Sequence, residues 1–563
     1  MRLRVFLAIA VTFAVKGVES SLDQVIVRTT NGPIRGVKRE NYYAFEGIPY
    51  AKSPTGEFRL AAPVLNDAIW EEPLDVSKPG PNCIQWNHYV QGEDKLVGEE
   101  DCLYLNVYTT SLSNNREPLP TIFHIHGGAL MFGSGDFWRP DHLLEKPFIL
   151  VTFNYRLGPL GFLSTEDDVI PGNFGLKDQA TALEWTRKNI HLFGGHPDQI
   201  TVTGYSAGSS CVQLFYLSPM TRGKFKNAIG HSGSALNPWV LAEDSSEKAQ
   251  KIATAVGCST RSTREMLMCL REQPAERLVR AVTALFDFLY NPFSPLGVVI
   301  EHESKENPRP FLTDHPYTLM EQGKFDRVPL LLSVNGAEGL YPGAEFLSKP
   351  EYLQRIEKEW NRLLPSILDY KSGFKRNEAR MNEISEIIRK RYLGDEPLSE
   401  DNFLELIRLM SNRLFFAGVV ESIRLMQRYI PVYFYLDQYK TAFGVGEYLS
   451  ETGKNLGCAH GEDVWLIHNN DFRRDVPYSD EERLMARRFV EMYGAFTRDS
   501  VAKFDRFEIP KTSDGGDKLQ FLEINFPDST LRSAEQLNDE DFWNQMDFNE
   551  GVPEKLALTR DEL

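Results

Sequence analysis

The chain has 563 residues, a formal net charge of −17 at pH 7 and six cysteines. This length suits one large α/β enzyme unit with insertions, and no internal repeat or Gly/Ser-rich linker divides it. The acidic surplus and the lack of a basic stripe argue against binding to the phosphate backbone of nucleic acids. The composition therefore favours a globular protein without a nucleic-acid partner.

The first twenty residues are predicted to be a signal peptide. Arg2 and Arg4 give a positive start, residues 5–15 an apolar core, and residues 17–21 small and polar positions near cleavage. The apolar part is too short for a comfortable membrane span, and no later segment approaches twenty uninterrupted apolar residues. We expect a single domain over residues 21–545, without a transmembrane segment.

A glycine-rich segment follows the apolar run Thr121 to Ile125, which we predict to be a strand. Residues 126–129 read H-G-G-A, which matches the H-G-G-G loop whose backbone N–H groups stabilise an oxyanion, except in the last place. Main-chain donors tolerate a methyl side chain if the backbone angles permit it. We assign Gly128 and Ala129 as donors; a plain glycine-rich turn is the alternative.

A serine flanked by glycines lies where a predicted strand, Ile200 to Thr203, gives way to a predicted helix, Ser209 to Leu217. Residues 204–208 read G-Y-S-A-G, and glycines on both sides of a sharp turn relieve its crowding. The string alone is a weak signal, because short runs of small residues recur by chance. Its context predicts Ser206 as a nucleophile and Ala207 as a third oxyanion donor.

A serine nucleophile needs a base and an acid that orients the base, and in this class of hydrolase the chain order is serine, acid, histidine. The predicted strand Val328 to Val334 is followed by Glu338, which we predict to be the acid. His460 stands in G-C-A-H-G and is the predicted base. His468 is a rival, but it has no flanking glycines and reads more like a packing or surface-loop residue.

With these parts placed, the sequence resembles the type-B carboxylesterases of the cholinesterase-like branch of the α/β-hydrolase superfamily. Residues 100–107 resemble the family block E-D-C-L-Y-L-N-V and residues 154–158 the block N-Y-R-L-G. The likeness runs from about Val25 to about Phe542. It implies an α/β-hydrolase fold with a large, mostly parallel central sheet, helices on both faces and a helical cap region.

The resemblance also implies the chemistry and the cysteine pairing. It places Ser206, Glu338 and His460 in a catalytic triad that hydrolyses small-molecule esters. The sequence has no H-E-x-x-H motif and no Gly-rich dinucleotide fingerprint, so we expect the chemistry to need no metal or cofactor. The resemblance pairs Cys83 with Cys102 and Cys258 with Cys269, each closing a short loop. We expect the two remaining cysteines, at positions 211 and 458, to be buried as small apolar residues.

The substrate is less closely defined by the sequence. Cholinesterases carry a glutamate before the serine and a tryptophan about ten residues before the second cysteine of the first disulfide, whereas this chain has Tyr205 and Gly92 there. Acetylcholine is therefore a poor candidate. A carboxylesterase acting on apolar, lipid-derived or xenobiotic esters is the default. The alternatives are a juvenile-hormone-type esterase, a lipase and a non-catalytic adhesion protein of the same fold.

Two further segments carry expectations. Residues 377–392 and 402–428 show helical spacing of apolar residues and form either a cap beside the site or an extension of the outer helix layer. Residues 546–563 read as a flexible tail that ends in Arg-Asp-Glu-Leu, a variant of the K-D-E-L retrieval signal. Together with the signal peptide, this tail predicts the endoplasmic reticulum lumen, with a retrieval receptor as partner and some escape to the outside.

Overall fold

The computed structural model describes residues 24–90, 92–112, 117–473, 476–546 and 548. The predicted signal peptide and the Arg-Asp-Glu-Leu end lie outside these residues. Within the ranges given, no helix combines the length and apolar character that a membrane crossing requires.

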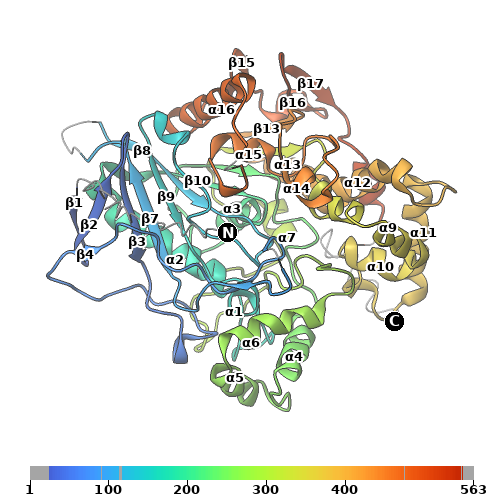
Figure 1. Ribbon diagram of the computed structural model, residues 1–563, viewed down its shortest axis with the longest axis horizontal. Helices are drawn as coiled ribbons and strands as arrows, with labels where there is room; N and C mark the ends of the chain where they lie inside the picture. Colours follow the sequence, from blue (N-terminus) through green and yellow to red (C-terminus); the bar gives the residue numbers. More distant parts are fainter. Residues whose placement is uncertain (1–23, 91, 113–116, 474–475, 547, 549–563) are drawn as a thin grey trace, which may run out of the picture.

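One 13-stranded sheet forms the centre of the molecule (Figure 1), in the order β1-β2-β3-β7-β9-β8-β10-β11-β12-β13-β16-β17, with β4 (Leu74–Asp75) paired to β2. In this sheet order, the seven consecutive strands that begin with β9 and end with β16 are parallel to one another. They are β9 (Ile149–Phe153), β8 (Leu119–Ile125), β10 (Gly195–Tyr205), β11 (Asn227–His231), β12 (Leu330–Asn335), β13 (Val432–Asp437) and β16 (Leu519–Ile524). The three strands predicted from the sequence, at 121–125, 200–203 and 328–334, are present as β8, β10 and β12, with ends that differ by a few residues.

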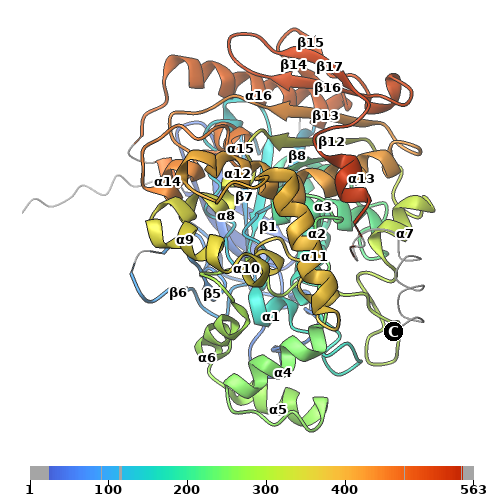
Figure 2. The same cartoon turned by 90° about the vertical axis from the view of Figure 1, so that its right-hand side faces the viewer.

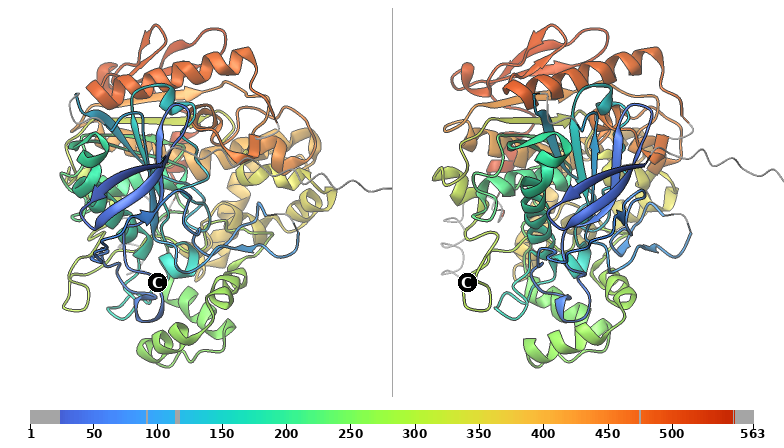
Figure 3. Two further views of the ribbon diagram at one scale, coloured as in Figure 1. Left: turned by 60° about the vertical axis from the view of Figure 1, so that its left-hand side comes forward. Right: turned by 90° about the vertical axis from the view of Figure 1, so that its left-hand side faces the viewer.

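Antiparallel strands extend the sheet at both edges. They are β1 (Gln24–Thr29), β2 (Gly32–Lys38), β3 (Tyr43–Pro49) and β7 (Tyr104–Thr109) at one edge and β17 (Thr530–Ala534) at the other. Figure 3 shows the blue strands β1 to β3 far from the red strands β16 and β17. The parallel part therefore lies in the interior, where continuous apolar runs such as β9 are buried along their whole length.

Two apolar clusters lie on opposite faces of the sheet, because successive strand side chains point to opposite sides. On β8, Phe123 belongs to the cluster that includes α2 (Phe174–Asn189) and α3 (Ala207–Leu217). Its neighbour Ile122 belongs to the cluster that includes α16 (Asp480–Asp499). The sheet is thus covered by helices on both faces, as the sequence predicted.

A group of helices between β12 and β13 stands beside the sheet (Figure 2). It contains α9 (Pro350–Lys358), α10 (Trp360–Ile367), α11 (Glu378–Tyr392), α12 (Phe403–Ser411) and α13 (Ala417–Met426). The predicted helices correspond to α11 and to α12 with α13. The second predicted helix is interrupted by a π-helical turn over Asn412–Phe416.

Candidate active site

The predicted nucleophile occupies a sharp turn between β10 and α3. Ser206 has φ 57° and ψ −124°, backbone angles that a residue with a side chain rarely adopts. A Cβ on Gly204 would lie 2.3 Å from the Gly208 carbonyl oxygen, and one on Gly208 would lie 2.1 Å from that of Ile125. The flanking glycines are therefore needed for space, while Ser206 itself carries the strained angles.

The predicted acid and base meet although 122 positions separate them. His460 Nδ1 is hydrogen-bonded to Glu338 Oε2. The other carboxylate oxygen accepts hydrogen bonds from Ser232 Oγ at 2.5 Å and from the Asn335 N–H at 2.6 Å. Ala337 donates its N–H to the Cys458 carbonyl at 2.8 Å, which ties the two loops together.

The far ring nitrogen of His460 is the distinctive feature of this pair. With Nδ1 bonded to a carboxylate, the neutral ring carries its proton there and leaves a lone pair on Nε2. Nε2 is buried and has no hydrogen-bond partner among the described residues. A buried basic nitrogen without a protein partner is free to accept a proton from a reacting group.

Aromatic side chains surround the imidazole of His460. The ring centroids of Tyr205 and Phe415 lie 4.8 and 4.6 Å from it, and Tyr341 stacks on it at 5.5 Å. Because Tyr205 directly precedes Ser206, the contact between the rings of Tyr205 and His460 places the predicted base beside the serine turn. Phe415 comes from the π-helical turn, so the helical region between β12 and β13 reaches the site.

The predicted oxyanion loop reaches the same turn. A Cβ on Gly127 would lie 3.0 Å from the Cβ of Ser206. Gly128, Ala129 and Leu130 all have positive φ, at 110°, 56° and 60°, and a Cβ on Gly128 would lie 1.9 Å from the Phe132 carbonyl oxygen. Ala129, which stands in the last place of the H-G-G-A segment, thus takes the left-handed conformation.

The proposed donors are free of protein acceptors. Ala207 is the first residue of α3, where an N–H has no intrahelical acceptor. In the described part of the chain, the N–H groups of Gly128 and Ala129 also donate no hydrogen bond. Three unpaired main-chain donors close to a strained serine form an anion-binding arrangement.

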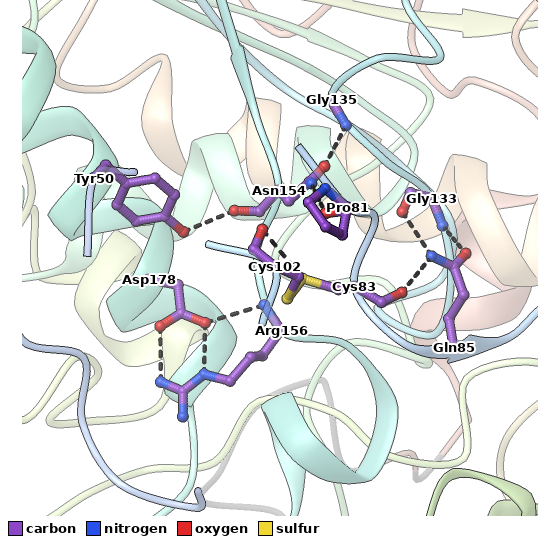
Figure 4. The surroundings of a disulfide bond; sticks show 10 residues. All are labelled: Tyr50, Pro81, Cys83, Gln85, Cys102, Gly133, Gly135, Asn154, Arg156 and Asp178. Carbon is purple, nitrogen blue, oxygen red and sulfur yellow. Dashed lines mark hydrogen bonds and ion pairs between the residues drawn. A yellow bond between two sulfur atoms is a disulfide. The ribbon is translucent and has the colours of Figure 1, made fainter. Parts of the chain in front are cut away.

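Two side-chain amides hold the oxyanion loop in place (Figure 4). Gln85 donates to the Gly133 carbonyl at 3.1 Å and accepts from the Gly133 N–H at 2.7 Å. Asn154 accepts from the Gly135 N–H at 2.8 Å and donates to the Pro81 carbonyl at 2.9 Å. Asn154 and Gln85, which lies inside the loop closed by the first disulfide, thus clamp one loop. The sequence analysis assigned neither residue a role.

Both cysteine pairs implied by the resemblance are disulfides. Cys83 and Cys102 have Cα atoms 4.8 Å apart, and Cys258 and Cys269 have Cα atoms 5.7 Å apart. Cys211 and Cys458 are buried as expected. Burial raises the pKa of the Cys211 thiol to about 12, so this residue is a protonated packing side chain at neutral pH.

A second histidine and carboxylate pair lies next to the first, and the sequence analysis did not identify it. His231 Nδ1 lies 2.9 Å from Asp463 Oδ2, and the same oxygen accepts from Ser333 Oγ and the Tyr435 hydroxyl, each at 2.9 Å. Burial alone would raise the pKa of Asp463, but His231 and the two hydroxyls outweigh it and lower the pKa. The His231 carbonyl accepts the Ser206 N–H at 2.8 Å.

The rival base is in a different environment. His468 is fully buried, with its ring 4.6 Å from that of His124 and 5.9 Å from that of Trp138. Burial lowers its pKa to about 3, so the ring is neutral and packed. Neither ring nitrogen of His468 makes a hydrogen bond to Glu338 or Ser206 in the described part of the chain.

Strand order and the serine turn together define the class of protein, an α/β-hydrolase. The chain belongs to the Carboxylesterase family, whose sequence profile matches residues 23–543. It is a carboxylic ester hydrolase, and the predicted fold class and activity are confirmed.

Its relatives include insect esterases. The chain is 35% identical to Venom carboxylesterase-6 of Apis mellifera over 535 residues, which covers 93% of this chain and 94% of that protein. It is 36% identical to Esterase-5A of Drosophila pseudoobscura pseudoobscura, covering 89% and 93%. Among solved structures, juvenile hormone esterase from Manduca sexta with OTFP covalently attached has a TM-score of 0.79 at 26% identity, covering 92% and 98%.

Proposed function

We propose that this carboxylesterase works through a covalent acyl-enzyme on Ser206, with His460 as general base and acid and Glu338 as the carboxylate that orients it. The observation that carries the proposal is the state of the His460 ring. Its Nδ1 is fixed on buried Glu338, whereas its Nε2 has no partner in the described chain and lies in the aromatic surroundings of the serine turn.

The chemistry follows from these positions. His460 Nε2 takes the hydroxyl proton as Ser206 Oγ bonds to the ester carbonyl carbon, and the carbonyl oxygen becomes an oxyanion. The N–H groups of Gly128, Ala129 and Ala207 stabilise that charge, each by about 3 kcal/mol. His460 then gives its proton to the departing alcohol. Water repeats the sequence on the acyl-enzyme and releases the carboxylate.

The substrate class we propose is apolar esters, either lipid-derived or xenobiotic. Tyr205, Tyr341 and Phe415 surround the base with uncharged aromatic surface, which favours apolar groups on either side of the ester bond. A juvenile-hormone-type substrate is a second candidate, since the Manduca sexta enzyme is similar over nearly the whole chain. Juvenile hormone and nitrophenyl esters of graded chain length, assayed side by side, distinguish the two.

Replacing the nucleophile tests the catalytic assignment. Ser206→Ala is expected to lower kcat/KM for nitrophenyl esters by about a thousandfold or more. An organophosphate should add one phosphoryl group to Ser206 of the wild type, seen by peptide mass spectrometry. Ser210→Ala is the matched control, because the buried Ser210 hydroxyl has no hydrogen-bond partner among the described residues. Full turnover in folded Ser206→Ala would refute the proposal.

We also propose that the protein resides in the endoplasmic reticulum lumen and is recognised there by a retrieval receptor. The two disulfides support an oxidising compartment, and the signal-peptide-like start and the Arg-Asp-Glu-Leu end support retention. Deleting residues 560–563 is expected to increase the secreted fraction several-fold in cultured cells. An unchanged secreted fraction would contradict retrieval by this tail.

A further inference from the structure

A groove of about 880 Å³ lies where the chain enters the interior strands β11 and β12, at the ends of these strands that are away from the serine turn. Leu217, at the end of α3, lines it, together with the loop that leads into β11 and residues 323–327 before β12. Ser206 precedes the first residue of the same helix. At about 1.5 Å per residue the 11 residues of α3 span about 16 Å, so this groove is separate from the proposed catalytic site.

Cationic side chains form the rim of this groove. Arg222, Lys224, Arg309 and Lys324 line it, and none of the four makes a side-chain hydrogen bond or salt bridge within the described ranges. Arg327 is a fifth cation, held by a 2.7 Å bond to the Gly323 carbonyl and stacked over Phe325. Unpaired cations gathered in one place are unexpected in a chain whose net charge is −17.

The carboxylates at the groove do not neutralise this rim. Glu303, Asp314 and Asp326 are the acidic residues among those that line it, against five cations. Asp326 accepts the Gly223 N–H at 2.7 Å and Asp314 accepts the His315 N–H at 2.8 Å. Two of the three carboxylates thus accept a backbone N–H. With five cationic and three acidic side chains, the net charge of the lining is positive.

The floor of the groove is apolar. Leu217, Leu319 and Phe325 line it and are at least 94% buried. The apolar side chains that reach the surface of the groove are those of exposed Pro219 and Pro308 and of half-buried Met220. The burial of Lys224 beside this floor lowers its pKa; Glu184 opposes that effect, while Arg309, Arg187 and Lys188 add to it. The volume lies in the range of small-molecule sites, about 300–1,000 Å³.

We propose that this groove binds an amphipathic organic anion, a carboxylate with an apolar chain. The rim cations would pair with the carboxylate, and Pro219, Met220 and Pro308 would pack on the apolar chain. An inorganic anion would leave these three apolar side chains uncovered, and an uncharged alcohol would leave the cations unpaired. The ligand resembles the carboxylate product of ester hydrolysis, but the site is remote from Ser206 and does not depend on the proposed catalytic roles.

The test is calorimetric titration of decanoate into full-length protein whose proposed nucleophile is blocked with an organophosphate, or into Ser206→Ala if no adduct forms. We expect one equivalent to bind, with an affinity that falls as NaCl rises from 50 to 300 mM. The double variant Arg309→Gln/Lys324→Gln should bind at least tenfold more weakly. Arg261→Gln/Arg264→Gln removes two exposed arginines elsewhere and should bind like the wild type.

Three results would overturn the proposal. They are equal decanoate affinity in the wild type and the groove variant, equal binding of decanol and decanoate, and inorganic phosphate binding as tightly as decanoate. Circular dichroism and thermal unfolding establish that each variant is folded. If the double variant is not, Arg222→Gln, which changes a single exposed rim residue, takes its place with the same expectation of weaker binding.

Discussion

Two buried histidine and carboxylate pairs lie side by side and differ at one nitrogen. His460 with Glu338 and His231 with Asp463 each use Nδ1 to contact a carboxylate. His231 Nε2 is also occupied, by the Tyr493 hydroxyl, and its ring stacks on that tyrosine. His460 Nε2 has no such partner in the described chain.

Under the proposed function, this difference separates a pair that transfers protons from a pair that supports the structure. A histidine whose two nitrogens are both satisfied has no lone pair to offer a substrate. The His231 pair instead supports the turn from beneath, because the His231 carbonyl accepts the Ser206 N–H. Proximity to the serine and contact with a carboxylate are thus insufficient to identify a general base. The assignment of His460 rests on its Nε2, which has no hydrogen-bond partner among the described residues.

The largest expected difference is in activity. His460→Gln should lower kcat/KM by about a thousandfold or more, because the proposed mechanism assigns removal of the serine proton to His460 Nε2. His231→Gln should lower it by less than tenfold. Steady-state kinetics with nitrophenyl butyrate, on variants whose thermal unfolding shows a folded state, measure both. A similar loss in a folded His231 variant would show that both pairs take part in catalysis.

The next effect is on stability. Asp463→Asn removes one member of a buried pair and should lower the free energy of unfolding at pH 7 by about 3 kcal/mol. The folded-state pKa of Asp463 is lowered, so its contribution is present above the unfolded pKa of about 3.9 and is lost as pH falls through the folded value.

Urea unfolding between pH 7 and pH 3 measures this contribution. The deficit of the variant should shrink only below about pH 4, the window given by the unfolded pKa. Asp198→Asn, at an exposed salt bridge to Arg187, is the control and should cost less than about 1 kcal/mol. A deficit that stays constant down to pH 3 would contradict a role for the Asp463 charge.

The smallest effect concerns the hydroxyl that occupies His231 Nε2. Tyr493→Phe leaves this buried nitrogen without a partner and should cost about 1 kcal/mol or slightly more. Tyr341→Phe is its counterpart, because the buried Tyr341 hydroxyl has no partner among the described residues. Thermal or urea unfolding should show that Tyr493→Phe is less stable than Tyr341→Phe. Equal stabilities would show that the Tyr493 contact contributes nothing.

The sequence predicted the residues that follow strand ends. Ser206, Glu338 and His460 were found from chain order and neighbouring glycines, and the structure brings the last two into contact. Strand runs such as Val328 to Val334 were found because a buried parallel strand is a continuous apolar run. Both signals are local, so a single sequence contains them.

Residues that act through distant contacts could not be predicted. His231 and Asp463 are 232 positions apart, and neither stands in a motif; only the end of the apolar run before His231 places it at a strand terminus. Gln85 clamps a loop 48 positions away. Phe415 reaches His460 because a π-helical turn interrupts an otherwise regular helical pattern. Pairings of this kind depend on the folded register.

The Gln85 clamp links the anion-binding loop to a covalent bond that forms only under suitable redox conditions. Gln85 lies two residues from Cys83 and also donates to the Cys83 carbonyl at 2.8 Å. If Cys83 and Cys102 were reduced, the segment that carries Gln85 would lose its covalent anchor. The position of the Gly133 end of the anion-binding loop is therefore coupled to the redox state of this disulfide through two hydrogen bonds with one side chain.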